Sequence, residues 1–163
     1  AFSGDRLIAY GILSFPGESE DNFGRDIGLP PDELKSVAHL ETSAVHPDYR
    51  GNGLQKKIFE IHFRTLENGN YGHALCTVSP KNYPSLRNMF DAGMVIRAVK
   101  IKFGWMLRYI LHKDFRLAGT VQAAEVERVP ADDLETQKRL LAAGWYGFDA
   151  VSDRGNIEIL FGK

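Results

Sequence analysis

Cysteine is scarce in this sequence of 163 residues, and its histidines do not follow a metal-binding pattern. Cys76 is the only cysteine, which excludes an intrachain disulfide and a cysteine-rich metal site. Its place in the apolar run 74–78 favours a packed core thiol over a nucleophile. The five histidines show no His-Glu-x-x-His or comparable ligand spacing. The sequence therefore predicts no metal.

A long hydrophobic run and an excess of one charge are also absent. No stretch is long enough to span a bilayer, and residues 1–14 lack the basic start and long apolar middle of a signal peptide. The 20 basic and 21 acidic residues give a net charge of -1, which offers no basis for binding nucleic acid or an anionic membrane. We therefore expect no nucleic-acid partner, no membrane partner and a cytoplasmic location.

The sequence does contain enough apolar residues, 44%, to form a substantial core. Alternating and helical patterns of apolar residues predict two kinds of element. Strands are expected at 1–3, 6–15, 37–45, 74–78, 95–103 and 105–112, and helices after residues 53 and 82. The loop 16–31 is long enough to be a functional loop or lid. This order predicts an α/β sheet with helices packed on it.

The most informative segment is 45–55, Val-His-Pro-Asp-Tyr-Arg-Gly-Asn-Gly-Leu-Gln, which joins a strand pattern to a helical one. The first N–H groups of a helix lack intrahelical partners and lie at the positive end of its dipole, so they can hold an anion. Gly51 and Gly53 keep the backbone accessible, and Arg50 adds a positive charge. The alternative interpretation is an ordinary surface turn, because Pro, Asp, Asn and Gly all favour turns.

Two common phosphate-binding motifs do not match this segment. A P-loop requires Lys and Ser or Thr after the last glycine, where Leu54 and Gln55 stand. A Rossmann fingerprint requires a third glycine at the position of Lys56. The segment instead resembles the signature Gln/Arg-x-x-Gly-x-Gly/Ala of the GNAT superfamily of acyl-CoA N-acyltransferases. Arg50 and Gly53 fill two of its three defined places, and Gln55 stands where a small residue is usual.

A second segment strengthens the resemblance to this N-acetyltransferase family. Asn82 and Ser85 match the Asn-x-x-Ser/Ala that begins the helix after the family's fifth strand, and Gly93 with Met94 matches the apolar pair that follows the helix. The resemblance implies a mixed, mostly antiparallel sheet flanked by helices. It also implies that the usual first strand and first two helices are missing before Ala1.

The resemblance further implies a reaction and its co-substrate. An acyl group, acetyl or another, would pass from acyl-CoA to an amine of a small molecule or peptide by direct attack. The pantetheine arm would lie between strands 37–45 and 74–78, which splay apart in this family. The residues expected to contact acyl-CoA are Ala44, Val45, Arg50, Gly51, Asn52, Gly53, Leu54, Gln55, Asn82 and Ser85.

Transfer to an amine requires a base, because deprotonating a lysine-like ammonium at pH 7 costs about 4.6 kcal/mol. His39 and Glu41 share one face of the strand 37–45, and either could act through a water molecule. Both could equally belong to a solvated or hydrogen-bonded face. Many family members protonate the thiolate with a tyrosine where this chain has Met89. Tyr83 is the remaining candidate, although it could instead pack at the helix start.

The C-terminal part, 116–163, is expected to be an extension of a catalytic core at 1–115. Its pattern predicts a strand at 120–129, a helix at 131–143 with Asp132 and Asp133 in the first turn, and a hairpin from 146 to 161. An Ala-Gly pair before a bulky apolar residue occurs at 92–94 and again at 143–145, which we attribute to helix C-cap chemistry rather than a repeat.

Three roles for this extension stay open: it could complete the sheet, cover the acceptor groove or form a homodimer interface. Two other functions also stay open. One is a non-catalytic module that binds or senses acyl-CoA. The other is an interaction domain that uses the aromatic side chains of Trp145, Tyr146 and Phe148.

Overall fold

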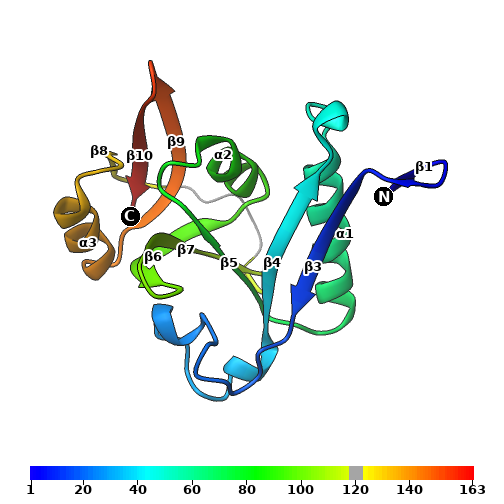
Figure 1. Ribbon diagram of the computed structural model, residues 1–163. Coiled ribbons are helices and arrows are strands. Elements are labelled where there is room, and N and C mark those ends of the chain that lie inside the picture. The colour runs from blue at the N-terminus through cyan, green and yellow to red at the C-terminus, as the bar shows by residue number, and fades with distance from the viewer. Residues whose placement is uncertain (118–122) are drawn as a thin grey trace.

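The computed structural model describes residues 1–117 and 123–163. Its main feature is a sheet with the strand order β3-β4-β5-β7-β6-β9-β10-β8, in which only β4 and β5 pair in parallel (Figure 1). Helix α1 packs beside β3 and β4, α2 against β9, and α3 against β6. The fold is thus the predicted mixed, mostly antiparallel α/β sheet with flanking helices.

The strands are β1 (Phe2–Ser3), β2 (Arg6–Leu7), β3 (Ala9–Ser14), β4 (Val37–Val45), β5 (His73–Val78), β6 (Val95–Lys102), β7 (Met106–Asp114), β8 (Val126–Pro130), β9 (Tyr146–Asp153) and β10 (Asn156–Gly162). The helices are α1 (Leu54–Asn68), α2 (Tyr83–Asp91) and α3 (Leu134–Ala142). Short 3-10 turns are η1 (Arg25–Ile27), η2 (Leu34–Ser36) and η3 (Pro47–Tyr49). Among the described residues, no helix has both the length and the apolar composition needed to cross a membrane.

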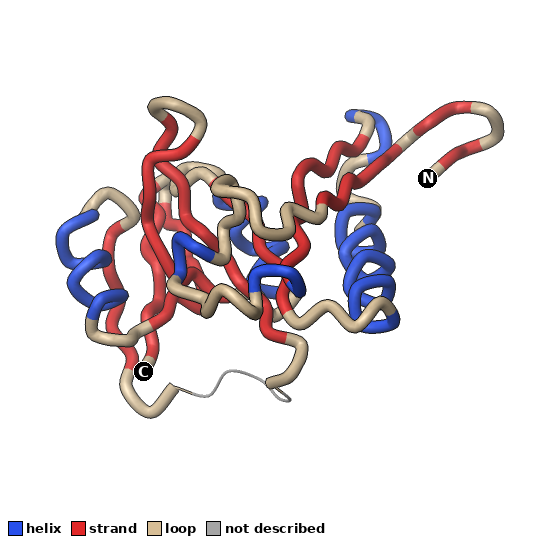
Figure 2. The backbone as a smooth tube through the Cα atoms, turned by 90° about the horizontal axis from the view of Figure 1, so that it is seen from below, coloured by secondary structure: helices blue, strands red, loops and turns tan. Residues whose placement is uncertain are grey.

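Three boundaries differ from the sequence prediction. The expected strand 6–15 is interrupted at Ile8, so that β1 and β2 form a separate hairpin that projects from the body of the molecule (Figure 2). Helix α3 begins after Asp133, whose carboxylate accepts a hydrogen bond from the Thr136 N–H at 3.1 Å and caps the helix. Both aspartates therefore precede the helix. Strand β8 begins at Val126, and residues 118–122 of the expected strand lie outside the described residues.

The same order of elements occurs twice. A first unit (73–114) contains β5, α2, β6 and β7, and a second unit (126–162) contains β8, α3, β9 and β10. Key positions of the first unit recur 51 residues later in the second. Asn82 and Asp133 are the helix N-caps, Gly93 and Gly144 follow the helices, and Gly104 and Gly155 lie in the hairpin turns. The Ala-Gly pairs at 92–94 and 143–145 were attributed to C-cap chemistry rather than a repeat, but they also belong to this repeated order of elements.

The two units meet in the sheet in mirrored order, β5-β7-β6 followed by β9-β10-β8. Ile96 of β6 pairs with Gly147 of β9, again 51 residues later, so equivalent positions face each other at the junction. One hydrophobic core includes buried residues from both units, among them Leu86 and Leu140. A boundary between domains at 115 and 116 stays a prediction, although the second unit continues the same sheet.

Candidate active site

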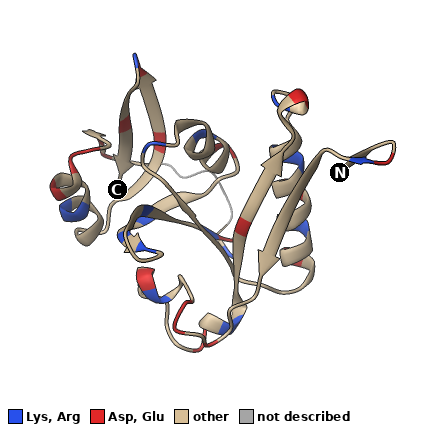
Figure 3. Cartoon of the chain, viewed as in Figure 1, with Lys and Arg blue, Asp and Glu red and all other residues tan. Residues whose placement is uncertain are grey.

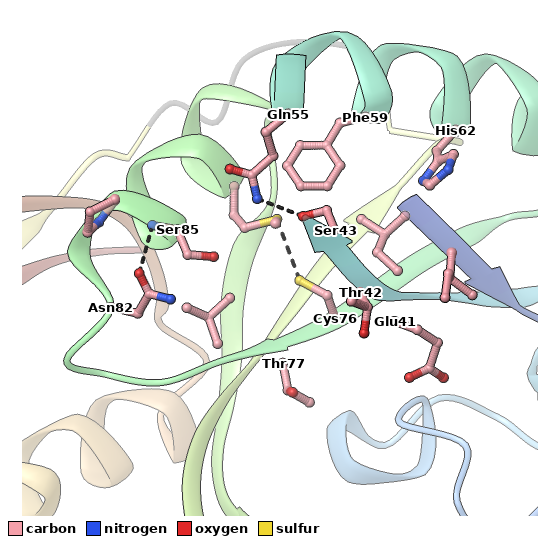
Figure 4. Close-up of a pocket in the computed structure, with 15 residues that line it drawn as sticks. Glu41, Thr42, Ser43, Gln55, Phe59, His62, Cys76, Thr77, Asn82 and Ser85 are labelled. Carbon is pink, nitrogen blue, oxygen red and sulfur yellow. Dashed lines mark hydrogen bonds between the residues drawn. The ribbon is translucent and has the colours of Figure 1, made fainter. Parts of the chain in front are cut away.

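The candidate site is a cleft that opens where β4 and β5 separate. The two strands pair only from Val37 with His73 to His39 with Leu75. Beyond these pairs β4 stays paired with β3, and β5 with β7. A cavity of about 360 Å³ lies between the separated ends (Figure 4). Separation of these two strands is the arrangement that the sequence resemblance implied for a pantetheine arm.

Five elements contribute side chains to this cavity, and β3 supplies Ile12. Figure 4 labels residues from the other four. Among the labelled residues, β4 supplies Glu41, Thr42 and Ser43, β5 supplies Cys76 and Thr77, α1 supplies Gln55, Phe59 and His62, and the start of α2 supplies Asn82 and Ser85. The structure therefore brings together four residues singled out from the sequence: Glu41, Gln55, Asn82 and Ser85. Ala44 and Val45 follow Ser43 on β4 and lead to the turn.

The turn after β4 has the conformation that its glycines allow. Gly51 and Gly53 have φ values of 79° and 68°, and a Cβ atom at either position would meet nothing within 4 Å. Gly53 is the N-cap of α1, and no side chain of the described residues caps this helix, so the N–H groups of its first turn, which begins at Leu54, have no capping partner there. The turn is held by Asn52, whose Nδ2 donates to the Tyr49 carbonyl at 3.1 Å.

Arg50 lies exposed beside this helix terminus. Its Nε donates to the Val45 carbonyl at 3.3 Å, and the other guanidinium N–H groups have no partner among the described residues. A guanidinium with free donors next to uncapped helix N–H groups is a suitable environment for a phosphate group.

Gln55 bridges the cleft. Its Nε2 donates to Ser43 Oγ on β4 at 2.8 Å, and its Oε1 accepts a hydrogen bond from Asn88 Nδ2 on α2. The amide thus connects the two walls of the cleft at a place where the resembling family has a small residue. A ligand that runs from the turn into the cleft has to pass this bridge or displace it.

Asn82 and Ser85 meet at the start of α2. Asn82 Oδ1 accepts a hydrogen bond from the Ser85 N–H at 3.2 Å and caps the helix (Figure 4). The cap uses only the carbonyl oxygen, which leaves the Asn82 amide N–H groups available to a ligand in the cavity.

Glu41 lies where three cavities meet. It lines the cleft, a second cavity of about 630 Å³ bounded by the loop 16–31 and the β6–β7 hairpin, and a third of about 460 Å³ toward β7. Its side chain is 40% exposed, and Oε1 accepts a hydrogen bond from Ser14 Oγ at 2.6 Å. A carboxylate that is fixed by a neighbour and still accessible from several sides is suited to accept a proton.

His39 is buried and contacts the carboxylate of Glu41 from the interior of the protein. Its ring is 3% exposed and stacks on Phe23, with 4.0 Å between the ring centroids. Its Nε2 accepts a hydrogen bond from the Phe23 N–H at 3.1 Å, and its Nδ1 lies 3.5 Å from Glu41 Oε1. Burial lowers the pKa of His39, which favours a neutral ring with the proton on Nδ1. Because the acceptor nitrogen is already occupied, this geometry suits positioning of Glu41 better than proton abstraction.

The remaining residues considered for acid or nucleophilic chemistry lie in the core or pack against it. Tyr83 begins α2 and packs against the main hydrophobic cluster, as does the buried Met89. The Cys76 thiol lies 3.6 Å from Met89 Sδ, and burial raises its pKa to about 12. The structure thus confirms the predicted packed core thiol.

Sequence reasoning missed several side chains at the site. His62 lies on the same face of α1 as Phe59 and lines the cleft, and its buried Nδ1 has no partner in the described part of the chain. A polar residue on an otherwise apolar helix face was the signal that could have found it. Phe103, at the tip of the β6–β7 hairpin, lines two of the three cavities around Glu41.

The loop 16–31 contributes Phe23 to the site and is tied to the β6–β7 hairpin. Asp26 forms an ion pair with Lys102 at 2.7 Å, and the Lys102 Nζ lies 5.1 Å from the centre of the Phe23 ring. Both partners of this ion pair are largely buried. The loop predicted to be a functional loop or lid therefore forms one wall of the cavity beside Glu41.

A polar cluster at the other end of β5 is the one group of metal-ligating side chains found among the described residues. Ligand atoms of His73, His112 and Asp114 lie within 4.8 Å of one another. His73 Nδ1 is 2.9 Å from His112 Nε2, and His73 Nε2 is 2.8 Å from Glu33 Oε2. Arg116 donates to Asp114 and adds a positive charge that disfavours a cation. We therefore interpret the cluster as a hydrogen-bond network that fastens η2 to the sheet.

A scan against models of protein families and a search of curated proteins give no match. Solved structures do resemble the chain. The ribosomal-protein-S18-alanine N-acetyltransferase of Escherichia coli matches with a TM-score of 0.53 and 17% identity, over 72% of this chain and 68% of that chain. YncA of Salmonella typhimurium, solved with its cofactor acetyl-CoA, matches with a TM-score of 0.53 and 16% identity, over 76% and 66%.

Nourseothricin acetyltransferase matches with a TM-score of 0.52 and 14% identity, over 68% of this chain and 59% of that chain. The chain thus spans between about three fifths and two thirds of the length of these proteins. Likeness at such identities concerns the path of the backbone, which includes the sheet that carries the cleft. The chain therefore has the fold of the GNAT N-acetyltransferases.

Proposed function

We propose that the protein transfers an acyl group, acetyl in the simplest case, from acyl-CoA to an amine. The observation that carries this proposal is the position of Glu41 in the cleft between β4 and β5, which opens next to the uncapped N-terminus of α1. One ligand could therefore present phosphates at the turn and a thioester near a carboxylate. YncA, whose structure contains acetyl-CoA, shares the fold.

The donor would be held mainly by backbone. Pyrophosphate oxygens would accept hydrogen bonds at the turn formed by Arg50, Gly51, Asn52 and Gly53, and from the helix N–H groups that begin with Leu54 and Gln55. The pantetheine amides would pair with the backbone near Ala44 and Val45. Asn82 would donate from its free amide N–H groups, with Ser85 beside it.

Glu41 would act as the general base. It would take a proton from the ammonium of the acceptor, directly or through a water molecule, and His39 would hold the carboxylate in place. The neutral amine nitrogen would attack the thioester carbonyl, the C–S bond would break, and the nitrogen would lose its second proton to solvent to give the amide. The CoA thiolate would take its proton from solvent, because Met89 stands where many members of the family have a tyrosine and the partly buried Tyr83 packs against the core.

The direct test combines binding and turnover. Calorimetry with CoA and acetyl-CoA should show binding, and a panel of small amines and peptides should release CoA thiol from acetyl-CoA. Binding without release from any amine would instead favour a non-catalytic acyl-CoA-binding module, for which the buried Met89 is the supporting observation. A lack of CoA affinity would contradict both functions.

An interaction domain based on Trp145, Tyr146 and Phe148 has less support, because all three side chains are partly buried and Trp145 packs against the core. A homodimer and a cytoplasmic location stay predictions.

A further inference from the structure

A groove lies between the two units. Its volume is about 1070 Å³, and it is lined by matching segments from both units. Residues 79–81 of the first unit and 130–132 of the second contribute to it, as do 105–107 and 156–158, each pair separated by the same 51 residues. The groove therefore depends on the presence of the second unit.

The groove continues into the candidate active site. Ser79, Met106 and Arg108 line both the groove and the cavity of about 460 Å³ that contains Glu41. A chain-like molecule with one end near Glu41 could thus extend past these three residues along the second unit. The smaller cavity alone falls in the size range that holds a small ligand, so the groove provides space for a larger one.

The lining has an apolar part and charged side chains of both signs. Trp105, Leu107, Leu134 and Ile157 supply apolar surface, and the Trp105 side chain is 81% exposed although large aromatic residues are usually covered. Such a residue is a common anchor in recognition surfaces.

Opposite charges line the two units. Lys81 and Arg108 lie on the first unit, and Arg108 belongs to the part shared with the cavity at Glu41. Asp132 and Asp153 lie on the second unit, where Figure 3 shows acidic residues near the start of α3 and on the β9–β10 hairpin below its basic tip. None of these four side chains forms an ion pair within the described ranges 1–117 and 123–163.

We propose that this groove binds a peptide acceptor whose N-terminal amine reaches Glu41, an inference that rests on the proposed acyl transfer. The peptide carries an acidic side chain close to its N-terminus, which meets Arg108 and Lys81. A basic side chain farther along meets Asp132 and Asp153. A polyamine fits less well, because its charges would meet Arg108 next to the reaction site.

The test uses the full chain with saturating CoA and two peptides of about eight residues, which extend over roughly 26 Å. They have the same composition and a fluorophore at the C-terminus. One places Glu at the second position and Lys near the end, and the other exchanges these residues. Fluorescence anisotropy should show the first peptide binding at least about tenfold more tightly. Because binding is measured directly, the result does not depend on turnover.

Charge reversal locates the binding site. Asp132→Lys combined with Asp153→Lys should remove the preference between the two peptides, whereas Glu60→Lys with Glu135→Lys makes the same change of charge outside the groove and should keep it. Trp105→Ala, at an exposed position, should weaken binding of both peptides. Equal binding of the two peptides, or an unchanged preference in the groove variant, would overturn the proposal. Failure of acyl transfer would appear separately, as absence of CoA release from every amine.

Discussion

The two units of the sheet have the same scaffold, but only the first unit borders the cleft between β4 and β5. In the first unit, β5 has β4 as a neighbour that separates from it, and the cap residue Asn82 faces the resulting cavity. In the second unit, β8 is the last strand of the sheet as described, and the cap residue Asp133 lines none of the three cavities around Glu41. The unit alone therefore does not create the candidate site; β4 and the turn before α1 complete it.

The units also differ in charge at equivalent positions. Lys81 and Lys102 of the first unit correspond to Asp132 and Asp153 of the second, 51 residues later. A carboxylate cap such as Asp133 would repel an anionic ligand, whereas the neutral Asn82 would not. Residues shared by both units therefore maintain the scaffold, whereas residues that differ between the units, such as Asn82 and Asp133, are candidates to serve a ligand.

The largest effect is expected from removing the proposed base. Glu41→Gln should lower kcat/KM at least about 100-fold at pH 7 and leave the affinity for acetyl-CoA unchanged, because the amide cannot take the proton of the acceptor amine. The rate of the variant should recover as the pH approaches the pKa of the amine. Steady-state kinetics with acetyl-CoA and an accepted amine measures both properties.

The matched control for this variant is Glu127→Gln on β8. The side chains of Glu41 and Glu127 are similarly exposed, at 40% and 41%, so the two substitutions perturb the surface alike. Glu127→Gln should keep normal turnover. If Glu41→Gln retained half of the activity of the unchanged protein, Glu41 would not be the base.

The first unit should also make the free energy of unfolding depend on pH in the acid range, because it contains His112, a largely buried residue on β7. Burial, together with the neighbouring His73, lowers the pKa of His112 to about 4 from its ordinary value of 6.5. The unfolded chain therefore binds a proton between pH 6.5 and pH 4 that the folded chain does not, so the free energy of unfolding falls as the pH falls through this range. The loss from this group is about 3 kcal/mol.

Urea denaturation at several pH values tests the contribution of His112. His112→Gln should reduce the loss of stability between pH 6.5 and pH 4, while the loss due to other buried histidines, such as His39, remains. Below pH 4 both proteins should lose further stability together, because Arg116 holds the pKa of Asp114 at about 2. An identical pH dependence above pH 4 would show that His112 is not the responsible group.

The turn before α1 allows a third comparison, between two glycines with positive φ. Gly53→Val should raise the KM for acetyl-CoA at least about tenfold, because a side chain would occupy the space near the helix N–H groups and the φ of 68° suits glycine. Gly144→Val has the same kind of strain at a φ of 86° but lies after α3. It should reduce stability and leave the KM unchanged. If calorimetry showed that the Gly53→Val variant binds CoA as tightly as the unchanged protein, the proposed phosphate site would be contradicted.

Local features of the fold could be predicted from the sequence alone, whereas contacts between distant segments could not. The strand 37–45 and the helix after Gly53 were predictable because the apolar pattern changes period at a turn marked by Pro47 and two glycines. The cap at Asn82 was predictable from its spacing to Ser85. These features depend on residues that are close together in the chain.

Features that join distant segments could not be predicted. The bridge from Gln55 to Ser43 and Asn88 depends on the packing of α1 and α2 against the separated strands. The contact of His39 with Phe23 depends on how the loop 16–31 folds back. The start of α3 was misplaced because two adjacent aspartates can each cap a helix, and tertiary packing decides between them.

The smallest expected effect comes from the two helix caps. Asn82→Ala and Asp133→Ala should each lower the free energy of unfolding by about 1 kcal/mol, because each leaves one helix N–H group without its partner, at Ser85 and Thr136 respectively. Only Asn82→Ala should also weaken CoA binding, by a few fold, since it removes amide N–H groups that face the cavity. Calorimetry and urea denaturation of the two variants separate these effects. Equal CoA affinity in both variants would mean that Asn82, like its counterpart 51 residues later, serves only the scaffold.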